Sequence, residues 1–269
     1  MSIYVELTRL FNSGKLRVVI CSGQAVVLHR LAIMSKDGDW IIREDKEALD
    51  HVLNVLSGFG ASYRFGAPLD IRWLKGGWSS HFEFRHNNLR VRTDFFSRPP
   101  RIHPERLNRL WEEQKSSDLP FLNPKDLADV KKTNREKDYA IIGELARLME
   151  SPGDQLLYSR SARDILALAE KHPYLTAKLG NQRPLLKRIT EGRDKLEEML
   201  DAEKRTLMHE NENRLACYLK SAEKWIGLWP LIEKEIHNLP LLEAHKIIID
   251  RIEGVLPFNP TVEDGEKNV

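Results

Sequence analysis

The chain has 269 residues, 41% of them apolar, which suits one large domain or two modest ones. Its 42 basic and 40 acidic side chains leave a net charge of +2, so overall charge does not indicate a nucleic-acid-binding protein. Two distant cysteines argue against a disulfide scaffold and a cysteine-rich zinc site, and no apolar run approaches the roughly 20 residues that cross a bilayer, so we expect a cytoplasmic protein without a membrane partner.

The first hundred residues predict a mixture of helices and strands. The spacing of Ile3, Leu7 and Phe11 predicts an amphipathic helix over 1–12 rather than a targeting peptide. Further helices are expected at 24–34 and 46–56. Strands are expected at 16–21, 38–42, 63–65, 71–74, 81–85 and 89–96. The segment 86–88 predicts a hairpin turn between the last two strands.

After the Ser-Arg-Pro-Pro segment at 97–100, the pattern is almost wholly helical. Helices are expected at 104–115, 124–133, 135–150, 161–171 and 184–229. The last of these segments is long and highly charged, and its pattern predicts one extended helix. We interpret its charged surface as one that serves packing and solubility. The alternative is an interface with another subunit or an antitoxin. We therefore expect an α+β fold, with a small mixed sheet and flanking helices over 1–100, a helical domain over 101–262 and a disordered tail over 263–269.

Three acidic residues are candidate metal ligands. Asp37 and Asp39 stand at i and i+2 at the start of a predicted strand, so their side chains point to the same face. Asp94 alternates with the apolar residues of its strand and lies away from their face. Paired carboxylates suit a hard divalent cation such as Mg²⁺. Taken alone, Asp-Gly-Asp is also a common turn sequence, and a lone strand acid is usually solvated.

The order of these features resembles the nucleotidyltransferase superfamily, which includes polymerase β, the aminoglycoside nucleotidyltransferases and the nucleotidyltransferase-like toxins of bacterial abortive-infection systems. The shared pattern is a strand, the pair Ser22-Gly23 opening a helix, Asp37-Gly38-Asp39, and Asp94 on a later strand. Thirteen residues, 24–36, separate the small pair from the first acid, and the resemblance covers 16–96. The chain departs from the family at Ser22, where glycine is usual, and at Gly38, where an aliphatic residue is usual.

The resemblance implies a Mg²⁺-dependent enzyme that transfers an NMP from an NTP to an unidentified acceptor, which is RNA, protein or a small molecule. Asp37 and Asp39 would hold Mg²⁺, or Mn²⁺ in its place, against the triphosphate, and Asp94 would help to hold a second metal and activate the attacking hydroxyl. Ser22, Gly23 and Lys36 would bind phosphate oxygens. A toxin paired with an antitoxin is the implied biological setting.

A second match lies in the helical part, where 126–139 resembles the lysine helix of the toxin-like branch. Lys131 is the candidate for contacting the triphosphate and Lys132 is the next choice, with Arg135 also assigned to nucleotide binding. If the helix is continuous, Lys131, Arg135 and Asp138 share one face, and Asp138 orients a basic partner. The alternative is an ordinary solvated surface.

Two other functions remain open. The first is an interaction protein built on a nucleotidyltransferase scaffold that has lost catalysis. The second is a nucleic-acid binder that uses a basic stripe, which consists of Arg85, Arg90, Arg92, Arg98 and Arg101. Trp73 and Trp78 are assigned to core packing over base stacking. The histidines His29, His51, His81 and His86 lack a metal-ligand spacing and are assigned structural or exposed positions.

Overall fold

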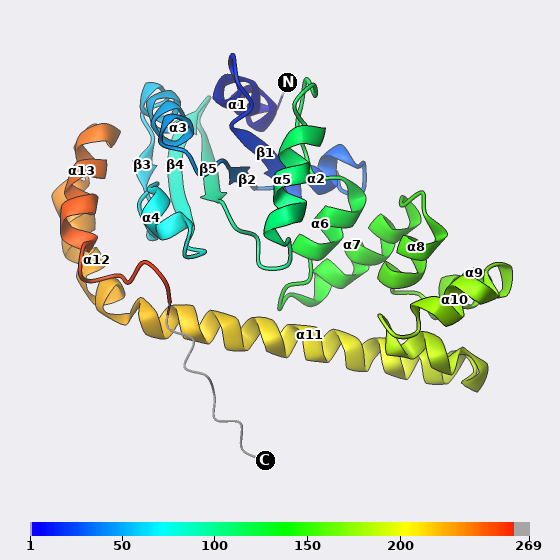
Figure 1. Cartoon of the computed structure of the whole chain (residues 1–269). Helices are drawn as coiled ribbons and strands as arrows, with labels where there is room; N and C mark the ends of the chain where they lie inside the picture. Colours follow the sequence, from blue (N-terminus) through cyan, green and yellow to red (C-terminus); the bar gives the residue numbers. More distant parts are fainter. Residues whose placement is uncertain (1, 261–269) are drawn as a thin grey trace. The chain divides into compact units, whose positions relative to one another are not determined.

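The computed structural model describes residues 2–260 and has an α+β fold (Figure 1). The described residues form two compact units. The first contains 2–28, 32–121 and 215–260, and the second contains 29–31 and 122–214. This partition differs from the boundary expected after residue 100, because 101–121 and 215–260 pack with the first hundred residues. The expected tail at 263–269 lies outside the described residues.

The first unit is built on a mixed sheet. Its strands are β1 (Val18–Cys21), β2 (Asp37–Ile42), β3 (Ser62–Tyr63), β4 (Ser80–His86) and β5 (Leu89–Phe96), and their spatial order is β1-β2-β5-β4-β3 (Figure 1). Strands β2 and β5 are parallel, whereas the other neighbours are antiparallel. The mixed sheet predicted from the sequence is therefore confirmed.

One face of this sheet forms the aromatic core of the unit. Trp40 of β2 stacks on Phe95 of β5, with ring centroids 5.3 Å apart, and Phe11 packs edge-on against Trp40 at 5.4 Å. Phe11 ends helix α1 (Ile3–Phe11), and Thr8 of the same helix accepts a 2.9 Å hydrogen bond from the Trp40 indole nitrogen. Helix α1 therefore covers this face because its apolar stripe meets the aromatic residues of β2 and β5.

The hairpin between β4 and β5 turns at two asparagines. Asn87 and Asn88 have φ values of 49° and 63°, in the left-handed region that a two-residue turn of this type requires. Because the turn fixes the register of the hairpin, His81 pairs with Asp94 and Glu83 pairs with Arg92. The predicted hairpin is confirmed.

The other helices of the first unit flank the sheet or follow it. They are α2 (Ser22–Leu28), α3 (Lys46–Gly58), α4 (Ile71–Leu74), α5 (Pro104–Glu113), α12 (Glu223–Ile236) and α13 (Leu241–Ile252). The strand expected at 71–74 is wrong, because the Asp70 carboxylate accepts a 2.8 Å hydrogen bond from the Arg72 amide and begins α4. Helix α2 also ends before the expected residue 34, and Arg30 beyond it has a φ of 61°.

Two tryptophans of the first unit contact the segment that follows α13. The side chains of Trp73 and Trp78 are buried, and their indole nitrogens donate to the carbonyls of Leu256 and Pro257 at 3.1 Å and 2.9 Å. Core packing is thus confirmed for both residues, and neither indole presents a face for base stacking.

The second unit is helical. It contains α6 (Pro124–Val130), α7 (Glu136–Arg147), α8 (Pro152–Tyr158), α9 (Ala162–Lys171), α10 (Pro173–Leu179) and the 3₁₀ helix η1 (Pro184–Glu191), and α11 (Arg193–Ser221) begins in it. Its core includes Leu156, Ile165 and Leu196. The single helix expected over 184–229 is wrong, because Gly192 has a φ of 95° and separates η1 from α11, and α12 begins after Ala222. No helix among residues 2–260 has the length and apolar character needed to cross a membrane.

Candidate functional site

Three carboxylates share one face of the sheet in the first unit. Asp39 of β2 is the register partner of Asp94 on the parallel strand β5, and Asp37 is the partner of Arg92. Register partners on neighbouring strands point to the same side of a sheet. Asp37, Asp39 and Asp94 therefore lie together on the face opposite Trp40, as the alternation of β5 predicted.

Asp94 is held by two basic side chains of the first unit. His81 Nδ1 lies 2.8 Å from Asp94 Oδ1, and Arg64 Nη1 lies 3.4 Å from the same oxygen. His81 is the register partner of Asp94 on β4, so the hairpin itself places the two side chains side by side. The sequence assigned His81 only a structural or exposed position. The register of the hairpin was the signal that could have found it.

Asp37 stands beside a second basic group. Arg92 Nη1 lies 3.6 Å from Asp37 Oδ1, which is an ion-pair distance and longer than a hydrogen bond. Asp37 Oδ1 and Arg92 Nε are both buried atoms without a hydrogen-bond partner in the protein. A buried carboxylate oxygen normally finds a donor or a cation, so this pair marks a position where a ligand atom fits.

Tyr4 of α1 is affected by the charge of all three carboxylates. Its hydroxyl donates a 2.6 Å hydrogen bond to the Lys36 carbonyl. Burial raises the pKa of Tyr4, and the negative charges of Asp37, Asp39 and Asp94 raise it further. One phenol thus experiences the charge of the whole carboxylate group.

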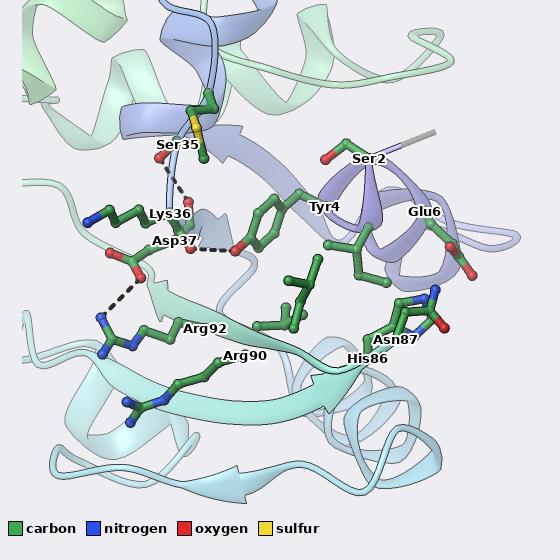
Figure 2. Close-up of a pocket in the computed structure, with 14 residues that line it drawn as sticks. Ser2, Tyr4, Glu6, Ser35, Lys36, Asp37, His86, Asn87, Arg90 and Arg92 are labelled. Atoms are coloured by element: carbon green, nitrogen blue, oxygen red, sulfur yellow. Dashed lines mark hydrogen bonds and ion pairs between the residues drawn. The ribbon is translucent and has the colours of Figure 1, made fainter.

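A pocket of about 670 Å³ adjoins Asp37 (Figure 2). Ile3, Leu89 and Val91 contribute to its apolar lining. Figure 2 shows the side chains of Lys36, Asp37, Arg90 and Arg92 together at one end, with the Tyr4 ring beside them. The pocket therefore combines an apolar part with a charged end, which is the usual composition of a small-molecule site.

The two glycines of the nucleotidyltransferase-like pattern have packing reasons for being glycine. A Cβ at Gly23 would lie 2.2 Å from Ser35 Oγ, and Ser35 Oγ donates to the Asp37 carbonyl at 3.2 Å. A Cβ at Gly38 would lie 2.4 Å from the Trp40 ring and 2.5 Å from the Tyr4 ring. Gly38 therefore departs from the usual aliphatic residue because two aromatic rings cover it. Ser22, the first residue of α2, has a φ of 51°.

The lysine segment lies in the second unit, and the condition of a continuous helix is not met there. Helix α6 ends at Val130 and α7 begins at Glu136, so Lys131 directly follows α6 and Asp138 lies in the first turn of α7. They still meet, because Lys131 Nζ lies 3.1 Å from Asp138 Oδ1 and Arg135 Nη2 lies 2.8 Å from Asp138 Oδ2. Asp138 therefore orients both basic side chains.

Lys131 is buried in this ion pair rather than solvated. Its side chain is 7% exposed and that of Asp138 is 3% exposed. Burial favours a higher pKa for Asp138, but the charges of Lys131 and Arg135 and the Thr133 hydroxyl outweigh it and hold the pKa below its usual value. Lys131 would have to leave Asp138 to contact a triphosphate. Lys132 is also ion-paired, because its Nζ lies 2.6 Å from Asp129 Oδ1.

Several members of the basic stripe are neutralised by acidic neighbours. Arg90 Nε donates to Glu83 at 2.9 Å, Arg98 Nη2 donates to Glu44 at 2.9 Å, and Arg92 pairs with Asp37. Nucleic-acid affinity depends on cations that can neutralise phosphates, so this pairing does not favour the nucleic-acid interpretation.

The carboxylates offer metal chemistry without a ready-made metal site. Their oxygens are the hard donors that Mg²⁺ prefers. Within residues 2–260, however, no group of three or more His, Cys, Asp or Glu side chains is arranged so that it could hold a metal ion. Asp37, Asp39 and Asp94 share one face of the sheet, and the negative charge of all three raises the pKa of Tyr4.

Comparison of the chain with family models, curated proteins and solved structures finds no match.

Proposed function

We propose that the chain is a Mg²⁺-dependent nucleotidyltransferase that moves an NMP from an NTP to an acceptor. The observation that carries the proposal is the placement of Asp37, Asp39 and Asp94 on one sheet face, with Asp39 opposite Asp94. Two paired carboxylates and a third on the neighbouring strand are the acids that the resemblance assigns to the metals. The acceptor is RNA, protein or a small molecule, and a toxin controlled by an antitoxin is the implied setting.

Asp37, Asp39 and Asp94 would hold the metal. When bound, Mg²⁺ supplies positive charge to the reacting phosphate and to the leaving pyrophosphate. Asp37 Oδ1 has no hydrogen-bond partner in the protein, which fits such a cation, although Arg92 Nη1 lies 3.6 Å away. Asp94 would exchange its contacts with His81 and Arg64 for the metal. Lys36, Arg90 and Arg92 would face the phosphates from the charged end of the adjoining pocket.

Calorimetric titration with Mg²⁺ and each of ATP, GTP, CTP and UTP tests this function. We expect metal-dependent binding of at least one nucleotide, and Asp39→Asn should abolish the metal dependence because it removes a ligand charge. The matched control is Asp118→Asn, since Asp118 is 88% exposed and pairs only with Arg9 among the ion pairs of the described chain. Its binding should equal that of the wild type. Failure of every nucleotide to bind would remove the proposal.

A second candidate is the interaction protein on a catalytically silent scaffold. The observation that favours it is the set of basic groups beside the carboxylates, because Arg64 and Arg92 supply positive charge where a metal would, and His81 Nδ1 lies 2.8 Å from Asp94. This candidate predicts that Asp39→Asn changes stability alone. Thermal unfolding with and without Mg²⁺ and ATP tests this candidate, since a scaffold that no longer binds nucleotide gains no stability from the ligands.

A further inference from the structure

The second unit contains a pocket of about 270 Å³ that is separate from the carboxylate face. Its lining includes three basic side chains, two tyrosines and one acid, which are Lys132, Arg160, Arg183, Tyr139, Tyr158 and Glu203. All of these belong to the same unit. The resemblance assigned Lys132 to nucleotide binding, but neither proposed function gives a role to the other residues of this pocket.

Two buried guanidinium groups share one carboxylate at this pocket. Arg183 donates to Glu203 from Nε at 3.0 Å and from Nη2 at 2.7 Å, and Arg160 Nη1 donates to the same Glu203 carboxylate. The side chains of Arg160 and Arg183 are 12% and 4% exposed. Buried charge is unfavourable unless it is balanced, so this group retains one positive charge in excess.

Backbone carbonyls fix the two guanidinium groups without adding negative charge. Arg183 donates to the carbonyls of Leu156 and Ser159 at 2.7 Å and 2.9 Å, and Arg160 donates to the Leu200 carbonyl at 2.7 Å. A guanidinium has five N–H groups, and the hydrogen bonds of Arg160 to Glu203 and Leu200 leave several of them available. Arg160 is therefore held in place by two hydrogen bonds, and its other N–H groups can donate to a ligand.

The pKa values at the pocket have the direction that excess positive charge predicts. Burial lowers the pKa of Arg160 and the charge of Arg183 lowers it further, against the opposing effect of Glu203. Burial favours a higher pKa for Glu203, but Arg183 and Arg160 outweigh it, so that the Glu203 pKa is lowered. Glu203 is therefore charged, and it offsets only one of the two guanidinium charges.

Lys132 and the tyrosines limit what can bind. Lys132 Nζ lies 4.6 Å from the Tyr158 ring centroid, and Arg160 Cζ lies 5.3 Å from that of Tyr139. Cations thus occupy a face of each aromatic ring, which leaves little room for a stacked base. The volume is also below the roughly 300–1,000 Å³ of drug-sized ligand pockets. These limits favour a compact anion.

We propose that this pocket binds a compact phosphate-bearing anion, with Arg160 as its main ligand and Arg183 in support. Lys132, which already pairs with Asp129 at 2.6 Å, has a secondary role. The phosphate is either a free ion or the phosphate end of a larger molecule. The proposal does not depend on nucleotidyltransferase activity, since no residue of the carboxylate face takes part.

Calorimetric titration of the full chain with inorganic phosphate, pyrophosphate and AMP, at constant ionic strength, tests the proposal. We expect saturable binding of at least one of them. Stronger binding of phosphate or pyrophosphate than AMP indicates a free ion, and the reverse indicates the end of a larger ligand. Arg160→Gln should weaken binding about tenfold or more, because a charge and its hydrogen bonds are lost.

Two further variants keep the result decisive. Arg147→Gln removes an exposed arginine from the same unit, where it pairs with Asp164 and Glu144, and it should bind the anion as the wild type does. Glu203→Gln should tighten binding several-fold, because the anion then has two guanidinium groups without a competing carboxylate. If the three charged groups only join helices, no saturable binding appears in the wild type or in Glu203→Gln. That result overturns the proposal even if Arg160→Gln does not fold.

Discussion

At Gly38, next to the carboxylate face, the structure leaves no room for a Cβ atom. A Cβ at this position would approach the Trp40 ring to 2.4 Å and the Tyr4 ring to 2.5 Å. Trp40 is fully buried and stacked on Phe95, so it cannot move without disturbing the core. We expect Gly38→Ala to lower the free energy of unfolding by about 1–3 kcal/mol, measured by chemical denaturation.

The control for this substitution is Gly227→Ala. Gly227 lies inside α12 and an added Cβ would meet nothing within 4 Å, so alanine should raise the free energy of unfolding by up to about 1 kcal/mol. Equal stability of the Gly38→Ala variant and the wild type would show that the two rings yield easily.

At the same scale, the sequence predicted the shared face of the acids but not their partners. The period of two in β5 was enough to place Asp94 away from Val91 and Phe95. The partner His81 depends on the hairpin register, and Arg64 depends on how the chain leaves β3. Contacts of that kind follow from tertiary pairing, which periodicity within one strand does not specify.

The turn between α6 and α7 depends on a buried ion pair. We expect Asp138→Asn to lower the free energy of unfolding by about 3–5 kcal/mol, because it leaves the buried Lys131 ammonium without its carboxylate. The control is Asp201→Asn in the same unit, since Asp201 pairs with Lys204 at the surface and its loss should change little. Denaturation curves at pH 7 provide the comparison.

The same pair also gives a pH dependence of known sign. The pKa of Asp138 is below its ordinary value of 3.8 in the folded state, so the unfolded chain binds this proton first as pH falls. Stability from the pair is fully present above about pH 4 and is lost as pH falls toward the folded pKa. The Asp138→Asn variant should therefore lose less stability than the wild type between pH 4 and pH 2. Parallel losses would contradict this assignment.

The elements with strong local signals were those that the sequence could predict. The two asparagines at 87–88 fixed the hairpin, and the apolar spacing of α1 fixed its buried stripe. The segment 71–74 failed because its apolar run is equally compatible with a strand, and the Asp70 cap decides the outcome. The long charged helix failed because one glycine at 192 with positive φ outweighs the helical pattern on both sides of it.

At the scale of the whole molecule, the C-terminal part of the described chain belongs to the same unit as its N-terminal part. Residues 215–260 pack with the N-terminal sheet in one unit, and Trp225 of α12 donates to the Gly66 carbonyl at 3.0 Å. The sequence placed these residues in a separate helical domain. A pairing across more than 150 residues leaves no periodic signal in either segment, so composition and spacing could not predict it.

We expect His245 to make the contact between α13 and β3 sensitive to pH. Its Nδ1 and the Tyr63 hydroxyl share a hydrogen bond of 2.7 Å, and the Leu69 amide donates to the same hydroxyl at 3.1 Å. Because the hydroxyl already accepts from Leu69, its proton is available for the neutral ring of His245. Burial lowers the pKa of His245 below its ordinary value of 6.5, since the charged form is poorly solvated there.

The sign of the resulting effect follows from proton binding. Below about pH 6.5 the unfolded chain binds a proton at this histidine while the folded chain resists it, so stability is lost as pH falls toward the folded pKa. We expect His245→Gln to have a flatter dependence of melting temperature on pH between 7 and 5 than the wild type. His209→Gln, at a side chain that is 73% exposed, should keep the wild-type slope. Identical slopes for all three proteins would show that the contact between α13 and β3 does not respond to this proton.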